Sequence, residues 1–139
     1  MKISELKPTN VFSIFEEITK IPRPSKKEEK IRAYLVDFAK KNNLDVKTDE
    51  IGNVLISKPA TPGHEDAPVI IMQGHMDMVC ESNDKSFDFT TTPITAVVDG
   101  EWVRAEGTTL GADCGIGMAA AMALLLDEEA EHGPIEALF

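Results

Sequence analysis

The sequence predicts an α/β fold in which a mixed central sheet is flanked by helices. Helix-type and strand-type segments alternate along the chain, which is typical of a layered α/β architecture. Apolar residues recur at helical spacing over residues 10–19 and 25–42. Residues 44–48 alternate between polar and apolar side chains, as a half-exposed strand does. Residues 69–72 form a continuous apolar run, which we expect to be a strand buried on both faces.

Local cap and turn patterns predict where several elements begin or turn. Ser25 followed three residues later by Glu28 has the spacing of a capping box, so we expect the second helix to start there. The segment 95–105 is strand-like on both sides of an Asp-Gly pair, which favours a β-hairpin with a tight turn. Trp102, in the second half of that hairpin, is expected to pack against the rest of the chain.

Length and composition exclude several classes of protein. A chain of 139 residues suits one domain. Its 14 basic and 24 acidic residues give a formal net charge of −10, which argues against nucleic acid as a partner. No apolar run approaches the roughly 20 residues that cross a bilayer, and the first residues lack the apolar core of a signal peptide. Two cysteines make no disulfide scaffold, so we expect a cytoplasmic protein with no membrane partner.

The first candidate site follows the apolar run of residues 69–72. His75 and Asp77 stand two residues apart, so in an extended backbone their side chains share one face. A neutral imidazole is a common zinc ligand, and a nearby carboxylate can bind the other ring nitrogen and fix the tautomer. The alternative, for so short a motif, is a histidine that is merely hydrogen-bonded at the end of a strand.

The second candidate site is the glycine-rich stretch 107–117, which leads into a helix-type segment rich in Ala, Leu and Met. Asp113 would lie near the start of that helix, where the helix dipole favours an anion, and its carboxylate could bridge two cations. A phosphate cradle is the rival interpretation, but the stretch lacks a phosphate-binding lysine and Asp113 would repel phosphate. A third interpretation makes Asp113 only a cap and turn residue.

Together these segments resemble a known family. The resemblance is carried by Ile-Pro-Arg-Pro-Ser at 21–25, the Gly-Asn-Val-Leu-Ile-Ser-Lys-Pro-Ala-Thr-Pro-Gly stretch at 52–63, Gln-Gly-His-Met-Asp-Met-Val at 73–79, and the segment 99–119 that contains Gly-Thr-Thr-Leu-Gly-Ala-Asp. In this order they are similar to the aminoacyl-histidine dipeptidases, also called Xaa-His dipeptidases, a branch of the zinc-dependent aminoacylase and carboxypeptidase superfamily. The resemblance covers nearly the whole chain.

The resemblance implies the following site. His75 would ligate one metal ion, Asp113 would bridge two divalent ions, and Asp77 would act in catalysis by orienting His75. The ions would be zinc, with manganese or cobalt as alternatives, and together they would polarise the scissile carbonyl of a dipeptide. The family's general base, remaining ligands and separate lid or dimerisation domain would follow these motifs, and the complete enzyme would be a homodimer.

The resemblance also implies that residues 1–139 are the N-terminal portion of the metallopeptidase catalytic domain. In the family a Glu-Glu pair follows the strand expected at 135–139, and Glu128-Glu129 is not a substitute because it stands at the end of a helix. We therefore expect the complete enzyme to hydrolyse carnosine-like Xaa-His dipeptides and this chain alone to be inactive. The alternatives are a related tripeptidase, aminoacylase or desuccinylase, or a non-catalytic folding or interaction fragment.

Overall fold

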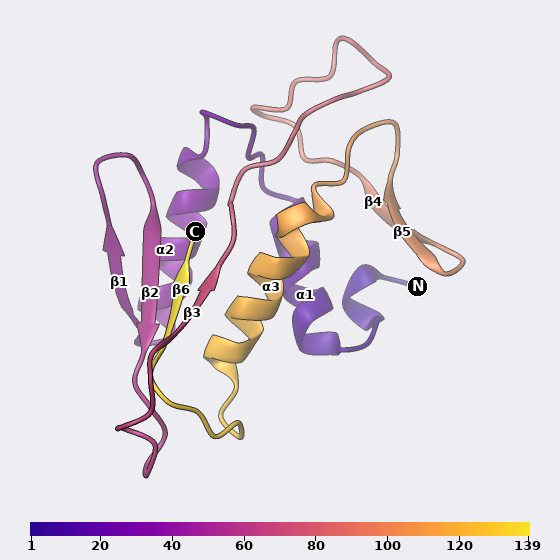
Figure 1. Cartoon of the computed structure of the whole chain (residues 1–139). Helices are drawn as coiled ribbons and strands as arrows, with labels where there is room; N and C mark the ends of the chain where they lie inside the picture. Colours follow the sequence, from indigo (N-terminus) through magenta and orange to yellow (C-terminus); the bar gives the residue numbers. More distant parts are fainter.

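The computed structural model describes residues 1–139, and its order of elements is that of an α/β protein (Figure 1). The helices are α1 (Thr9–Thr19), α2 (Glu29–Lys41) and α3 (Ala112–Leu126), preceded by a short 3-10 turn, η1 (Ile3–Glu5). The strands are β1 (Asp45–Thr48), β2 (Val54–Lys58), β3 (Ile70–Gln73), β4 (Ala96–Asp99), β5 (Trp102–Ala105) and β6 (Ile135–Leu138).

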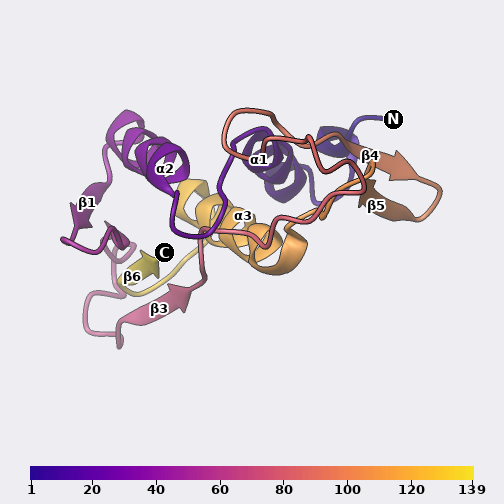
Figure 2. The same ribbon diagram turned by 90° about the horizontal axis from the view of Figure 1, so that it is seen from above.

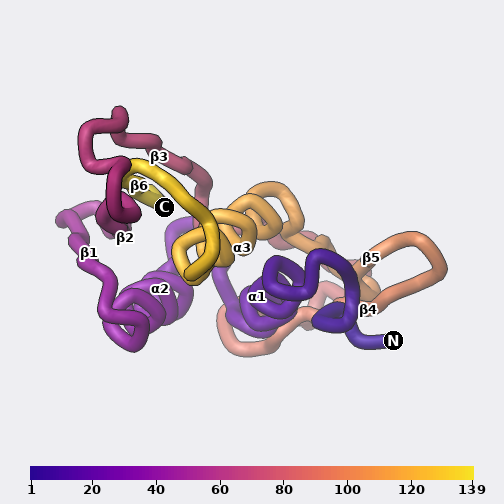
Figure 3. Tube along the Cα trace, turned by 90° about the horizontal axis from the view of Figure 1, so that it is seen from below, coloured from indigo at the N-terminus to yellow at the C-terminus, as the bar shows by residue number.

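Four strands form one mixed sheet in the order β1-β2-β6-β3. The pairs β1–β2 and β2–β6 are antiparallel, whereas β3 runs parallel to β6. Helices α2 and α3 lie against the same face of this sheet, as the views from above and below both show (Figures 2 and 3). The predicted mixed sheet with flanking helices is therefore confirmed, and both helices that contact the sheet, α2 and α3, lie on one face of it.

The core lies between that face of the sheet and the helices. Val54 and Ile56 of β2 are fully buried under the helices, and the residue between them is only half-buried, because successive strand residues point to opposite faces. Helix α3 is apolar nearly all round, which suits a helix enclosed by other elements. On its far side α3 packs against α1, where Phe15 and Met118 are both buried (Figure 2). The sheet and its helices thus give a stable base for the loops at the end of β3.

The prediction that residues 69–72 are buried on both faces is wrong. The strand exists as β3, but Val69, Ile70 and Ile71 are each more than half exposed. Two physical causes explain this: β3 is the edge strand and pairs only with β6, and no helix of the chain covers its outer face. The apolar run therefore predicts that a strand forms, but it does not predict whether that strand lies at the centre or the edge of the sheet.

The hairpin over residues 95–105 is confirmed, and it forms a separate two-stranded sheet of β4 and β5. It projects from the end of the molecule opposite the main sheet (Figure 1). Trp102 is 76% exposed there, so the expected packing of its side chain is wrong. None of the helices has the length and apolar character that crossing a membrane requires.

Candidate metal site at the end of β3

His75 and Asp77 lie in the loop that leaves the carboxyl end of β3. The Nδ1 atom of His75 is 2.9 Å from Oδ1 of Asp77 and 3.0 Å from the Asp77 carbonyl oxygen. Both partners are acceptors, so Nδ1 is assigned a proton, and in the neutral imidazole Nε2 then has the free lone pair. A lone pair on Nε2, with Nδ1 held by a carboxylate, is the arrangement that metal-binding histidines use.

Ser25 holds the other oxygen of the same carboxylate. Its hydroxyl donates a hydrogen bond to Oδ2 of Asp77. This bond is the largest cause that lowers the pKa of Asp77, and the contact with His75 lowers it further against the opposing effect of partial burial. Asp77 is therefore kept ionised and fixed at both oxygens. The expected capping box is wrong for this reason: the Ser25 hydroxyl faces Asp77, and α2 begins at Glu29.

Asp113 approaches from the start of α3. Its backbone leaves the helical region, with φ −78° and ψ 123°, and its side chain is 91% exposed. The Oδ2 atom lies 4.0 Å from Nε2 of His75. The two loops come this close because Gly74 leaves room for Cys114, whose Sγ would lie 2.6 Å from a Cβ at that position. The structure thus brings together all three residues singled out in the sequence.

An imidazole and a carboxylate are suitable donors for a divalent metal ion, but two donors are too few for a complete site. Zinc bonds of about 2.0–2.1 Å at tetrahedral angles put two ligand atoms roughly 3.3 Å apart, and the Asp113 carboxylate lies 4.0 Å from Nε2 of His75 and is exposed. No group of three or more His, Cys, Asp or Glu side chains is placed so that together they could hold a metal ion. Glu128 and Glu129 are exposed in the loop after α3 and do not contribute. His75 and Asp113 are therefore two candidate metal ligands, which is fewer than a complete zinc site has.

Arg23 is the residue of this region that the sequence reasoning missed. Its side chain is 1% exposed, and its guanidinium donates hydrogen bonds to main-chain carbonyls in both loops of the site. Burial lowers the pKa of Arg23, while Asp77 and Asp113 raise it. The only sequence signal was its place in the Ile-Pro-Arg-Pro-Ser motif, because nothing in local spacing links residue 23 to residues 76 or 111.

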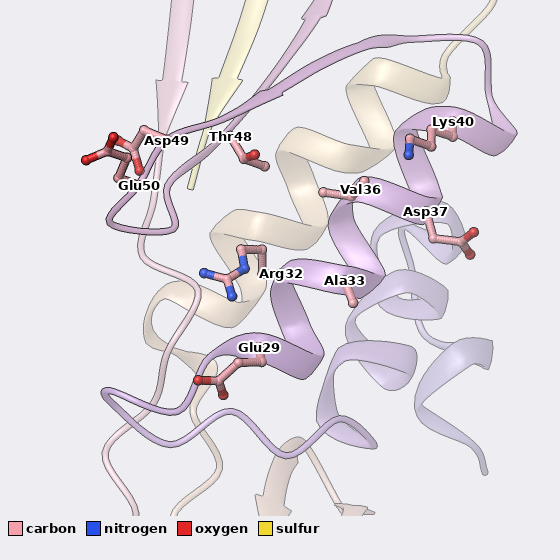
Figure 4. A pocket seen from close by; sticks show the side chains of 9 residues that line it. All are labelled: Glu29, Arg32, Ala33, Val36, Asp37, Lys40, Thr48, Asp49 and Glu50. Atoms are coloured by element: carbon pink, nitrogen blue, oxygen red, sulfur yellow. The ribbon is translucent and has the colours of Figure 1, made fainter.

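Two hollows lie near these elements, and only the smaller includes the site. A hollow of about 230 Å³ is lined by residues of α2, the β1–β2 turn and the loop after β3, among them His75 and Asp77. A larger one, about 640 Å³, lies between α2 and the β1–β2 turn (Figure 4). Its wall carries side chains of both charges, including Arg32 and Asp49, and neither His75 nor Asp113 reaches it. Because His75 and Asp77 line only the smaller hollow, that hollow is the more suitable place for a ligand to bind beside them.

Comparisons with known proteins decide the family resemblance. No protein-family model matches the chain. The cytosol non-specific dipeptidase of Escherichia coli is 49% identical over 138 residues, which are 99% of this chain and 28% of that protein. The crystal structure of aminoacylhistidine dipeptidase from Vibrio alginolyticus matches with a TM-score of 0.95 at 49% identity, again over 99% of this chain and 28% of that one. This chain resembles the N-terminal part of an aminoacylhistidine dipeptidase.

The predicted resemblance is thus confirmed, and the chain spans about 28% of the length of both dipeptidases. The same fold recurs in a dinuclear metal-binding peptidase of the M20 family from Bacillus subtilis, with a TM-score of 0.58 and 17% identity over 94% of this chain and 34% of that one. At that identity the likeness concerns the fold alone. Proteins other than aminoacylhistidine dipeptidases therefore also have this layered architecture.

Proposed function

We propose that residues 1–139 are the N-terminal portion of a metallopeptidase catalytic domain, and that the complete enzyme hydrolyses dipeptides of the Xaa-His type. The observation that carries the proposal is the approach of His75 and Asp113 to 4.0 Å, with the far side of the imidazole held by Asp77. The 49% identity to an aminoacylhistidine dipeptidase supports the choice of substrate class, and the name of the Escherichia coli relative supports a cytosolic location.

In this proposal Nε2 of His75 and the carboxylate of Asp113 are two of the metal ligands. Bound divalent ions would polarise the scissile carbonyl and activate water for its attack. Zinc is our first choice because the donors are one imidazole and one carboxylate, and the dinuclear metal site of the Bacillus subtilis peptidase supports two ions rather than one. Manganese and cobalt accept the same donor types.

Asp77 has a separate task, which is to hold the imidazole. Its Oδ1 accepts the Nδ1 proton of His75 and thereby directs the Nε2 lone pair toward Asp113. Ser25 restrains the second oxygen, so that the carboxylate does not turn away from the ring. An ionised carboxylate behind a ligating histidine also raises the basicity of that ligand.

Metal titration of the 139-residue chain tests the site assignment. We expect weak zinc binding by calorimetry, because two protein ligands are fewer than the three or four of complete zinc sites. His75→Ala and Asp113→Ala should each abolish it. His64→Ala is the matched control, since His64 is a partly exposed histidine outside the candidate site, and its ring lies 3.6 Å from Glu131. Equal zinc binding by the parent and both site variants would overturn the proposal.

Substrate assays test the reaction class. We expect no carnosine hydrolysis by the 139-residue chain with zinc or manganese, because the carboxylate beside His75, that of Asp77, is hydrogen-bonded to both His75 and Ser25 and is not free to serve as general base. We expect the complete enzyme to cleave Xaa-His dipeptides faster than tripeptides or acylated amino acids. A preference for tripeptides, or for N-acyl substrates, would favour the related tripeptidases or aminoacylases instead.

A further inference from the structure

The guanidinium of Arg23 is buried without a carboxylate partner, which is unusual for a charged side chain. Its Nη1 donates to the carbonyl oxygens of Met76 and Asp77, at 3.1 Å each. Its Nη2 donates to the carbonyl oxygen of Gly111 at 2.7 Å. The first two carbonyls directly follow His75, and the third precedes Asp113 by two residues. One side chain therefore joins the two loops of the candidate site.

The main chain around Arg23 strengthens the same connection. The carbonyl oxygen of Arg23 accepts a hydrogen bond from the N–H of Met78 at 3.0 Å, and Pro24 forms a parallel bridge with Met78. Ser25, two residues further, donates to the carboxylate of Asp77. The connector between α1 and α2 thus runs beside the loop after β3 and is bonded to it through both side chains and main chain.

Two glycines of the 107–117 stretch make room for this guanidinium. A Cβ at Gly111 would lie 2.6 Å from Nη2 of Arg23, and a Cβ at Gly115 would lie 2.9 Å from the same atom. Both distances are shorter than van der Waals contact. The space that these glycines leave is therefore filled by Arg23, which gives this part of the stretch a role other than a phosphate cradle.

We propose that Arg23 is a positioning residue that sets the distance between His75 and Asp113, and through it the metal affinity of the site. The inference rests on the proposed function. A planar guanidinium presents donors in fixed directions, so the carbonyls that it binds are held at a fixed separation. A lysine at this position has one ammonium group and cannot reach both loops in the same geometry. The metal ligands are then displaced although the charge is kept.

Zinc and cobalt titrations of the 139-residue chain test this role. We expect Arg23→Lys to lower zinc affinity about 10–100-fold, as loss of partners that orient metal ligands does. Gly115→Ala should act in the same direction by displacing the guanidinium. Its matched control is Gly117→Ala, in the same helix, where a new Cβ would lie 3.4 Å from Cys114 Sγ and meet only ordinary contact. The visible absorption of bound cobalt should change with Arg23→Lys but not with Gly117→Ala.

A purely structural role for Arg23 would give a different pattern. Leu125→Ala removes core volume at the C-terminal end of α3, about three helical turns from Asp113, and should lower thermal stability without changing zinc affinity at temperatures where the protein is folded. Parental zinc affinity in folded Arg23→Lys, or an equal loss of affinity in Leu125→Ala, would overturn the inference. If the parent and His75→Ala bind zinc equally, the proposed function fails and this inference fails with it. If His75→Ala loses zinc binding but Arg23→Lys does not, only this inference fails, so the two outcomes are distinguishable.

Discussion

Arg23→Met is the substitution whose effect on stability most directly tests the account of the buried guanidinium. Methionine replaces the apolar stem of the arginine and removes all of its donors, so three carbonyl oxygens lose a partner. Two of these bonds are fully buried and one is partly buried. Each unsatisfied buried acceptor costs about 1–3 kcal/mol, so the gross loss for three acceptors is about 3–9 kcal/mol.

This gross loss is partly offset because Arg23→Met removes the desolvation penalty of a buried positive charge. Desolvation is the largest cause of the lowered pKa of Arg23, and the effective penalty for a buried ion is several kcal/mol. The nearby carboxylates of Asp77 and Asp113 reduce that penalty, because both raise the same pKa. We therefore expect the bonds to outweigh desolvation, and Arg23→Met to lower the free energy of unfolding by about 2 kcal/mol.

Equilibrium unfolding in urea, followed by far-ultraviolet circular dichroism, measures this change. With a slope of about 2 kcal/mol/M, a loss of about 2 kcal/mol moves the midpoint down by about 1 M. Arg104→Met is the control, because Arg104 pairs with Asp99 at 2.8 Å on the exposed hairpin and such pairs contribute little. A midpoint for Arg23→Met at or above that of the parent would instead show that the cost of burying the charge exceeds the contribution of its hydrogen bonds.

Three further predictions concern other parts of the chain. Hydrogen bonds from Asn53 are the chief cause that lowers the pKa of Asp49 in the folded protein. The Asp49 carboxylate therefore stabilises the fold at pH values above its unfolded pKa of about 3.9, and this stabilisation is lost as the pH falls through the lower folded pKa. Asn53→Ala should raise the pKa of Asp49 toward its ordinary value in an NMR titration of the carboxyl carbon, and an unchanged pKa would contradict this. Ile71→Lys should reduce concentration-dependent self-association in sedimentation experiments, because it puts a charge on the exposed apolar face of the edge strand, whereas Ile51→Lys in the β1–β2 turn should not. Asp77→Asn should shift the histidine that it contacts toward the tautomer protonated on Nε2, as read from ring ¹⁵N shifts, and the parental tautomer ratio would argue against an orienting role.

Much of the fold could be predicted because it depends on neighbouring residues. Helical spacing predicted α1, and alternation predicted β1, each to within a residue or two of the bounds in the structure. The Asp-Gly pair predicted the turn between β4 and β5. The spacing of His75 and Asp77 predicted that their side chains meet, and the contact of 2.9 Å agrees. In each case the backbone geometry of a few consecutive residues decides the outcome.

The errors fall where packing overrides a local pattern. Ser25 has the residue type and spacing of a helix cap, but Asp77, distant in sequence, competes for its hydroxyl and takes it. Ile70 and Ile71 have the composition of a buried strand, yet the sheet order puts them at the edge. Trp102 is apolar, and the hairpin carries it away from the core.

Local sequence patterns predict the class of fold, most of its elements and the three residues on which a metal site could be built. The distance of 4.0 Å between Asp113 and His75, and the hydrogen bonds by which Arg23 joins the loops that carry them, depend on long-range packing. The difference lies in the range of the interactions. Periodicity, caps and turns act over a few residues of backbone, whereas a buried hydrogen bond between residues 23 and 111 exists only once the core has fixed both loops in place.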